Sequence, residues 1–174
     1  FITGTGTGVG KTAIGRALVR AARNRGIDAV AVKPVESGVV NPCESDAYLL
    51  AKAAMRENRN EKNCLYSFSK PVSPHLAAEY ENRIINPNTV CEFLRDWTSK
   101  SDLVLAEGAG GLLVPLGAGV LFVDIVVEIG FEILVVAPNI LGTINTTLLT
   151  IEACKSRGLN INGVVLNGSP TDKW

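Results

Sequence analysis

A glycine-rich stretch near the start of the chain has the residue types of a phosphate-binding loop. Gly4 to Thr12 reads GTGTGVGKT and stands between a short apolar run and a helical pattern. Glycines let successive backbone N–H groups turn toward an anion and let the loop approach a phosphate closely. We expect Lys11 to reach the β and γ phosphates of a nucleotide and the Thr12 hydroxyl to hold Mg²⁺. The spacing departs from the usual GxxxxGK[ST] because Thr5 replaces the first glycine, and a turn without ligand is the less favoured interpretation.

Three more charged residues lie where apolar runs end or helices begin. Lys33 opens KPVESG after the run 29–32, Glu107 follows the run 103–106 and precedes GAGG, and Asp46 stands near a helix start. The carboxyl ends of parallel strands face the ligand crevice. A lysine there stabilises charge on a transferring phosphoryl group, and two carboxylates beside Thr12 supply oxygen ligands for Mg²⁺. The alternatives are a strand-end lysine in solvent, an aspartate that only caps its helix and a glutamate in a solvated loop.

Polar groups for a second substrate are candidates in three places. The Ser37 hydroxyl follows the second strand and could hold an oxyanion or a polar substrate. The segment PNILGTIN, 138–145, ends a strand and opens a helix, so its free N–H groups could receive a carboxylate. An ordinary strand-to-helix turn is the commoner reading of such a segment. His75, the single histidine, is more often structural than catalytic in a loop of this kind.

The elements that must position these groups alternate between short apolar runs and longer amphipathic stretches, the pattern of βαβ units. We expect an α/β fold, a P-loop NTPase-like three-layer sandwich with a mainly parallel central sheet, and a loop with at most short elements over 58–83. The expected strands are 1–3, 29–32, 103–106, 133–137 and 164–166. The expected helices are 10–25, 46–55, 87–99, 122–129 and 143–157.

Length and composition predict one compact domain over 1–174. Seventeen basic residues balance seventeen acidic ones, so we expect no electrostatic attraction to nucleic acid or to an anionic membrane. Four scattered cysteines and one histidine argue against zinc or a disulfide framework. The apolar runs are shorter than the roughly 18 residues of a membrane span. We therefore expect a cytoplasmic protein.

Motifs along essentially the whole chain resemble the dethiobiotin synthetase family in order and spacing. They are FITGTGTGVGKT, KPVESG, SDAYLL, SPHLAA, VLAEGAGGLLVPL, LGTIN and GVVLNG. The resemblance implies a cytoplasmic homodimer that forms the ureido ring of dethiobiotin from 7,8-diaminononanoate, CO₂ and MgATP. Gly6 stands where the family commonly has an acidic residue, and we expect the final segment of the family to be missing after Trp174.

The same resemblance assigns roles to matching positions. It implies catalysis by Lys11 and Lys33, and magnesium binding by Thr12, Asp46 and Glu107. Contact with the diamine or its carbamate is implied for Thr7 and Ser37. The substrate carboxylate, held across the dimer interface in the family, is implied to meet Gly142, Thr143, Ile144 and Asn145. ATP contacts are implied for Gly8, Val9, Gly10, Lys11, Thr12, Ala13, Glu107, Gly108, Ala109, Gly110 and, at the adenine, Asn167.

Three other functions fit part of this pattern. A dimeric ATPase switch of the partition or septum-placement type shares the deviant loop, but such proteins resemble one another in a lysine at the position of Gly6. A corrin-amidating ligase of the same superfamily is usually longer. A nucleotide-binding module without chemistry leaves Lys33 and Glu107 unexplained.

Overall fold

The computed structural model describes residues 1–56 and 62–168, and its centre is a parallel sheet of five strands. Their order is β2-β5-β1-β8-β9, and neighbouring strands pair in parallel. The bounds are β1 Ile2–Gly4, β2 Ala29–Val32, β5 Leu103–Gly111, β8 Ile133–Pro138 and β9 Ile161–Asn167. The expected parallel α/β sheet is confirmed, and it aligns the carboxyl ends of β1, β2 and β5 at one edge.

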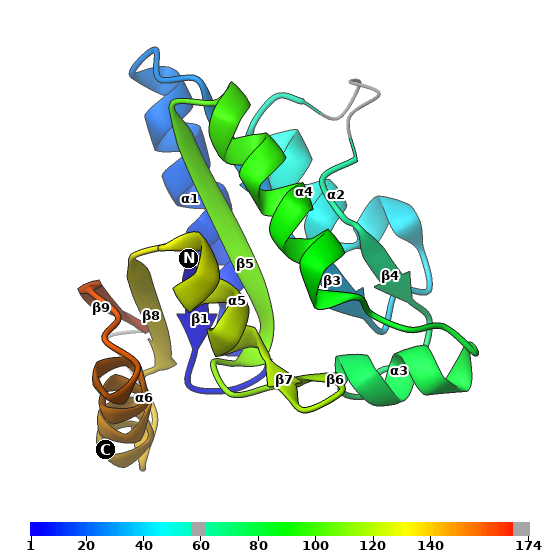
Figure 1. Cartoon of the computed structure of the whole chain (residues 1–174). Coiled ribbons are helices and arrows are strands. Elements are labelled where there is room, and N and C mark those ends of the chain that lie inside the picture. Colours follow the sequence, from blue (N-terminus) through cyan, green and yellow to red (C-terminus); the bar gives the residue numbers. More distant parts are fainter. Residues whose placement is uncertain (57–61, 169–174) are drawn as a thin grey trace.

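Helices cover both faces of this sheet. They are α1 Lys11–Asn24, α2 Asp46–Ala53, α3 Pro74–Tyr80, α4 Pro87–Lys100, α5 Phe122–Ile129 and α6 Thr143–Ser156. Figure 1 shows α4 and α5 in front of the sheet and α1 behind it. Val19 of α1 and Leu50 of α2 share one buried cluster with Ala29 and Ala31 of β2. Leu94 of α4 and the helices beside it cover the opposite face, which completes three layers.

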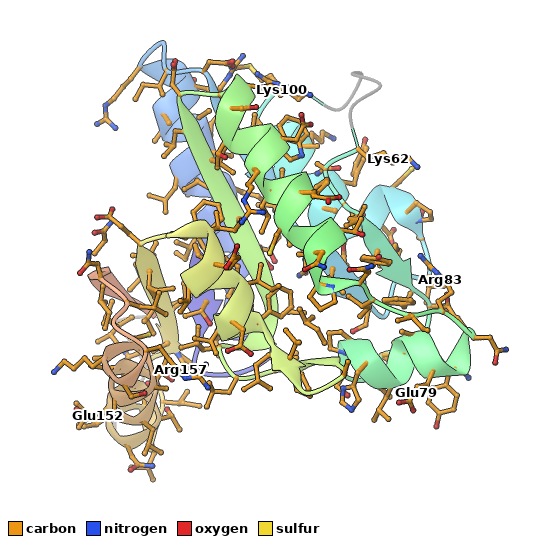
Figure 2. The ribbon with its side chains drawn as sticks, in the orientation of Figure 1. Lys62, Glu79, Arg83, Lys100, Glu152 and Arg157 are labelled. Carbon is orange, nitrogen blue, oxygen red and sulfur yellow. The ribbon has the colours of Figure 1, made fainter. Side chains whose placement is uncertain are left out.

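Short elements fill the connections around the sheet. β3 Val35–Ser37 pairs in parallel with β4 Tyr66–Phe68, and β6 Pro115–Gly117 pairs with β7 Val120–Leu121. A short 3-10 helix, η1, spans Pro42–Glu44. The segment expected to be a loop therefore holds β4 and the short helix α3 within its described part, and residues 57–61 lie outside the described residues. Charged side chains on the helices, such as Glu79, Lys100 and Glu152, point outward (Figure 2).

The prediction that the strand beginning at 103 ends at 106, before Glu107 and GAGG, is wrong. β5 continues through Glu107 to Gly111, and Ile2 and Gly4 of β1 pair with those two residues. Glycine is required at Gly108 by close packing, because a Cβ there would lie 2.9 Å from Phe1 Cζ. The glycines thus continue a buried strand past the carboxylate instead of ending it.

Candidate functional site

The glycine-rich loop connects β1 to α1 at the carboxyl edge of the sheet. Gly10 is the N-cap of α1 with φ near 100°, a left-handed conformation that favours glycine. Asn167, at the end of β9, donates from Nδ2 to the Val9 carbonyl at 2.9 Å. A Cβ on Gly10 would lie 1.9 Å from that nitrogen. The amide of Asn167 therefore holds the loop from the far edge of the sheet, and only glycine at position 10 leaves room for it.

The side chain of Lys11 extends back toward this loop. It is buried, and Nζ donates to the Gly6 carbonyl at 3.0 Å. Burial lowers the pKa of Lys11 below its usual 10.5, although the negative charge of the nearby Glu107 carboxylate raises it in part. A buried ammonium with one hydrogen bond has donors to spare for an anion. Its position in the first turn of α1 places it beside the helix N-terminus, where a phosphate is favoured.

Lys33 and two carboxylates form the electrostatic centre of the site. Lys33 Nζ donates to Glu107 Oε1 at 2.8 Å and also to Asp46 Oδ2. Both Lys33 and Glu107 are buried, with 6% and 1% of their surface exposed. Burial alone lowers the pKa of Lys33, but the two carboxylates outweigh it and hold that pKa above 10.5. The lysine is thus an ion-paired cation inside the protein, and the alternative of a strand-end lysine in solvent is wrong.

Asp46 does not serve as a helix cap. Ser45 is the N-cap of α2, and its hydroxyl accepts from the Tyr48 N–H at 3.1 Å. The Asp46 carboxylate remains available and points to Lys33. The sequence alternative in which this aspartate only caps its helix is therefore wrong.

The oxygen donors around Lys33 suit a magnesium ion bound together with a nucleotide. The Thr12 hydroxyl donates to Glu107 Oε1 at 2.9 Å, so Thr12, Asp46 and Glu107 converge on one place. Glu107 Oε2 is buried and has no hydrogen-bond partner among the described residues. No group of three His, Cys, Asp or Glu gathers within 1–56 and 62–168. Magnesium at nucleotide sites commonly takes one or two carboxylates plus phosphate oxygens, so these residues fit it.

A cavity of about 620 Å³ lies over this cluster. Most of the residues predicted from the sequence line it: Thr7, Gly8, Gly10, Lys11, Thr12, Lys33, Ser37, Asp46, Glu107, Ala109 and Gly110. Its volume falls in the range typical of small-molecule sites. One open space therefore adjoins the phosphate loop, the lysines and the carboxylates together.

Several predicted residues do not line this cavity. Val9 is buried against Ile2 and Val136, Ala13 lies exposed on α1 and Gly108 packs against Phe1. Asn167 contacts the loop backbone rather than the open space. The segment 142–145 opens α6 and is not part of the lining.

The lining also contains residues that the site prediction left out, namely Pro71, Val72, Ser73, Pro74 and Val114. The first three lie in the connection from β4 to α3, and Pro74 is the first residue of α3. The signal that could have found them is the SPH motif at 73–75, which stands in the segment SPHLAA of the resemblance described above. His75 is the second residue of α3, and its buried Nδ1 has no partner in the described part of the chain.

None of the helices in the described ranges has the length and hydropathy to cross a bilayer. Solved structures with a P-loop NTPase-like fold are similar in shape to this one. The kinase domain of the Escherichia coli tyrosine kinase ETK matches with a TM-score of 0.60 at 18% identity, over 99% of this chain and 68% of that one. A ParA family ATPase from Chlorobium tepidum matches with a TM-score of 0.57 at 15% identity, over 99% and 75%. At these identities the likeness concerns the fold alone.

Sequence relatives identify the family. A family model described as an AAA domain matches residues 1–173. An ATP-dependent dethiobiotin synthetase BioD of Anaeromyxobacter dehalogenans is 47% identical over 96% of this chain and 75% of its own length. The protein of the same name from Anoxybacillus flavithermus is 36% identical over 99% and 79%. Identity at this level over nearly the whole chain means that the chain belongs to the ATP-dependent dethiobiotin synthetase family.

Proposed function

We propose that this chain is a ligase of biotin biosynthesis that uses ATP to carboxylate 7,8-diaminononanoate and close the ureido ring of dethiobiotin. The observation that carries the proposal is the convergence of Lys11, Lys33, Thr12 and Glu107 on one cavity beside the phosphate loop. Cations and an oxygen donor set at a helix N-terminus are the parts that a phosphoryl transfer requires.

The proposed reaction has three steps. A neutral amine of the diamine attacks CO₂ and loses a proton, which gives a carbamate. A carbamate oxygen then attacks the γ phosphorus of ATP, and ADP leaves as the carbamic-phosphoric anhydride forms. The second amine attacks the carbamate carbon and loses a proton, the ureido ring closes, and inorganic phosphate departs.

The residues contribute position and charge rather than covalent chemistry. Lys11 lies in the first turn of the phosphate-loop helix, where its ammonium can move from the Gly6 carbonyl to a phosphate oxygen. Lys33, at the carboxyl end of β2, stabilises the charge that develops on the transferring phosphoryl group. Thr7 and Ser37 line the same cavity and are proposed to bind the diamine or its carbamate. Holding the reactants in line accounts for much of the rate in such sites.

We further propose that Thr12, Asp46 and Glu107 hold Mg²⁺ with the nucleotide. The unpartnered Glu107 Oε2 supports this assignment. When bound, the ion neutralises phosphate charge. Lys33 now bridges the same two carboxylates, so its ammonium and the ion compete for them. With the two carboxylates engaged by the ion, the Lys33 ammonium would be free to bind the phosphoryl group.

The substrate carboxylate is proposed to bind at the start of α6, where Gly142 is the N-cap. The Thr143 hydroxyl there is buried without a partner among the described residues. A homodimer would bring this helix start to the site of the other protomer. Large apolar side chains on α6 and just before it support the homodimer, since Leu141, Ile144, Leu148 and Leu149 are all more than half exposed. Asn167 as a reader of adenine, the single domain over 1–174 and the cytoplasmic location stay predictions.

The test is incorporation of labelled CO₂. The chain, MgATP, the diamine and labelled bicarbonate should yield an acid-stable labelled product together with ADP and phosphate. Free carbamates release CO₂ in acid, so acid-stable label reports ring closure. Product formation that needs no ATP, or the absence of acid-stable label with a folded chain, would contradict the proposal.

The partition-type ATPase switch differs in one measurable property. A switch hydrolyses ATP without regard to a diamine, whereas the synthetase couples hydrolysis to it. ATP hydrolysis should therefore rise strongly when diaminononanoate and bicarbonate are added together. The likeness to the ParA family ATPase, at 15% identity, does not favour the switch because it extends only to the fold.

A further inference from the structure

Glu36 is a buried acidic residue that the reaction does not use directly. It lies in β3 with 5% of its surface exposed, between the cavity residue Ser37 and buried Val35. Its Oε1 accepts from the Asp46 N–H at 2.6 Å, and its Oε2 accepts from the Ala47 N–H at 3.1 Å. Both oxygens thus bind the first two residues of α2 from a different element.

These bonds complete the start of α2. A helix leaves its first four N–H groups without partners inside the helix. Ser45 supplies acceptors for the next two, because its hydroxyl binds the Tyr48 N–H and its carbonyl binds the Leu49 N–H. Ser45 therefore accepts from the N–H groups of Tyr48 and Leu49. The Glu36 carboxylate, from β3, accepts from those of Asp46 and Ala47.

Burying a carboxylate is costly, so its position calls for a reason. Burial raises the pKa of Glu36 above 4.5, although Lys33 and the two N–H bonds oppose that shift. An Asn or Ser just before the helix in sequence could cap its first N–H groups without the free-energy cost of burying a charge. A carboxylate anchored in β3 does something that a local cap cannot, because it fixes α2 relative to the strand that carries Ser37.

We propose that Glu36 is a positioning residue for Asp46 and, through it, for magnesium. Glu36 sets the place of the first turn of α2, so that the Asp46 carboxylate reaches the cluster of Lys33 and Glu107. The inference rests on the proposed function, in which Asp46 is a metal ligand. Partners that orient the ligands of a metal commonly affect its affinity about 10- to 100-fold.

The fold offers a second support that keeps α2 in place when Glu36 is changed. The Asn63 side chain donates to the Ala47 carbonyl, and the Asn63 carbonyl accepts from the Lys33 N–H at 2.9 Å. Leu50 and Ala51 of α2 are buried as well. We therefore expect variants of Glu36 to fold, with Asp46 displaced rather than α2 lost.

The experiment measures metal binding directly. Mn²⁺ affinity of the full chain with a non-hydrolysable ATP analogue is followed by electron paramagnetic resonance for the parent, Glu36→Gln and Glu36→Ala. We expect Glu36→Ala to weaken Mn²⁺ binding by about tenfold or more. Glu36→Gln retains the size and one acceptor oxygen, so it should recover part of that loss. Asp124→Asn is the control, because Asp124 accepts the Leu121 N–H at the start of α5, at a distance in sequence from the cluster.

A double-mutant cycle separates positioning from a general structural role. If Glu36 acts through Asp46, adding Glu36→Ala to Asp46→Asn should weaken Mn²⁺ binding by less than threefold more. Losses that multiply, or Mn²⁺ binding by folded Glu36→Ala within twofold of the parent, would overturn the inference. The readout needs no diamine. Failure of the parent to make a ring product would therefore count against the proposed function and leave the test of Glu36 intact.

Discussion

Lys33 Nζ lies 2.8 Å from Glu107 Oε1, inside the protein and at the edge where two neighbouring strands carry their polar residues. Register explains the contact. Val32 pairs with Ala106 between β2 and β5, so the next residue of each strand is the lysine and the glutamate. The parallel sheet thus brings together residues 74 positions apart without any loop to arrange them.

Lys33→Ala should lower turnover at least about a hundredfold, the loss typical of removing a charge-stabilising donor. It should also lower the free energy of unfolding without nucleotide by about 3–5 kcal/mol, because buried Glu107 loses its cation. The measurements are steady-state turnover with the diamine and urea unfolding with and without Mg²⁺. Lys100→Ala is the control, since Lys100 forms an exposed pair with Asp96. Turnover within tenfold of the parent by a folded Lys33→Ala would rule out the catalytic role.

Gly10→Ala should weaken ATP binding at least tenfold. The new Cβ would overlap the Asn167 amide, and alanine at a φ near 100° adds backbone strain of about 1–3 kcal/mol. Isothermal titration with a non-hydrolysable ATP analogue measures the effect. Gly8→Ala is the matched comparison, because its φ is also positive but, within 1–56 and 62–168, no atom beyond its two chain neighbours lies within 4 Å of the added Cβ.

The Asn167 contact can be tested in the same series. In the double variant Gly10→Ala/Asn167→Ala, the loss of affinity should be smaller than the sum of the losses of the two single variants, because the second change removes the overlap and leaves only the strain. Equal losses for Gly8→Ala and Gly10→Ala would mean that the overlap with Asn167 has no effect on the loop.

Much of the site followed from the sequence because it depends on strand ends and a local motif. Lys11, Thr12, Lys33 and Glu107 were predicted near one another since parallel strands share a carboxyl edge. The continuation of β5 past Glu107 was missed because GAGG has the composition of a turn, while its glycines serve close packing against Phe1.

Other parts of the site depend on pairings that leave no local pattern. β3 and β4 have three residues each and pair across about thirty positions of sequence. Strands of three residues are too short to show the alternation of apolar and polar residues that identifies a strand. The cavity residues 71–74 follow β4, so the pairing of β4 with β3 determines where they lie. The link from Asn167 to Val9 needs the edge strand β9 to lie beside β8, which is a property of the whole sheet.

Stability at acid pH should depend in part on Asp28. Hydrogen bonds from Arg56 and Arg23 lower the pKa of Asp28 below its usual 3.8. The folded pKa is the lower one, so the stabilisation is fully present above 3.8 and disappears as the pH falls through the folded value. Asp28→Asn should thus reduce the free energy of unfolding at neutral pH by less than about 1 kcal/mol, since the pair is partly exposed.

The check is urea unfolding of the parent and Asp28→Asn across a series of pH values. The difference between the two proteins should shrink toward zero as the pH falls below 3.8. A difference that grows in acid would mean that the pKa of Asp28 is raised rather than lowered. Asp96→Asn, which removes an exposed pair with Lys100, is a suitable comparison.

The apolar surface of α6 connects assembly with the substrate carboxylate. Leu148 is 55% exposed on the helix whose first turn is proposed to bind that carboxylate. Leu148→Glu should convert a dimer to a monomer in sedimentation velocity, because a charge in an apolar interface is costly to bury.

If the neighbouring protomer supplies the start of α6 to the site, the same variant should raise KM for the diamine. The expected rise is about tenfold or more, which matches the loss of one or more hydrogen bonds to a charged group. ATP analogue binding should change little, because the phosphate loop, Lys11 and Lys33 come from one chain. Leu18→Glu, a similar change at a partly exposed position of α1, should alter neither assembly nor KM. A monomeric Leu148→Glu with unchanged KM would separate the two ideas, because the carboxylate would then be bound within one protomer.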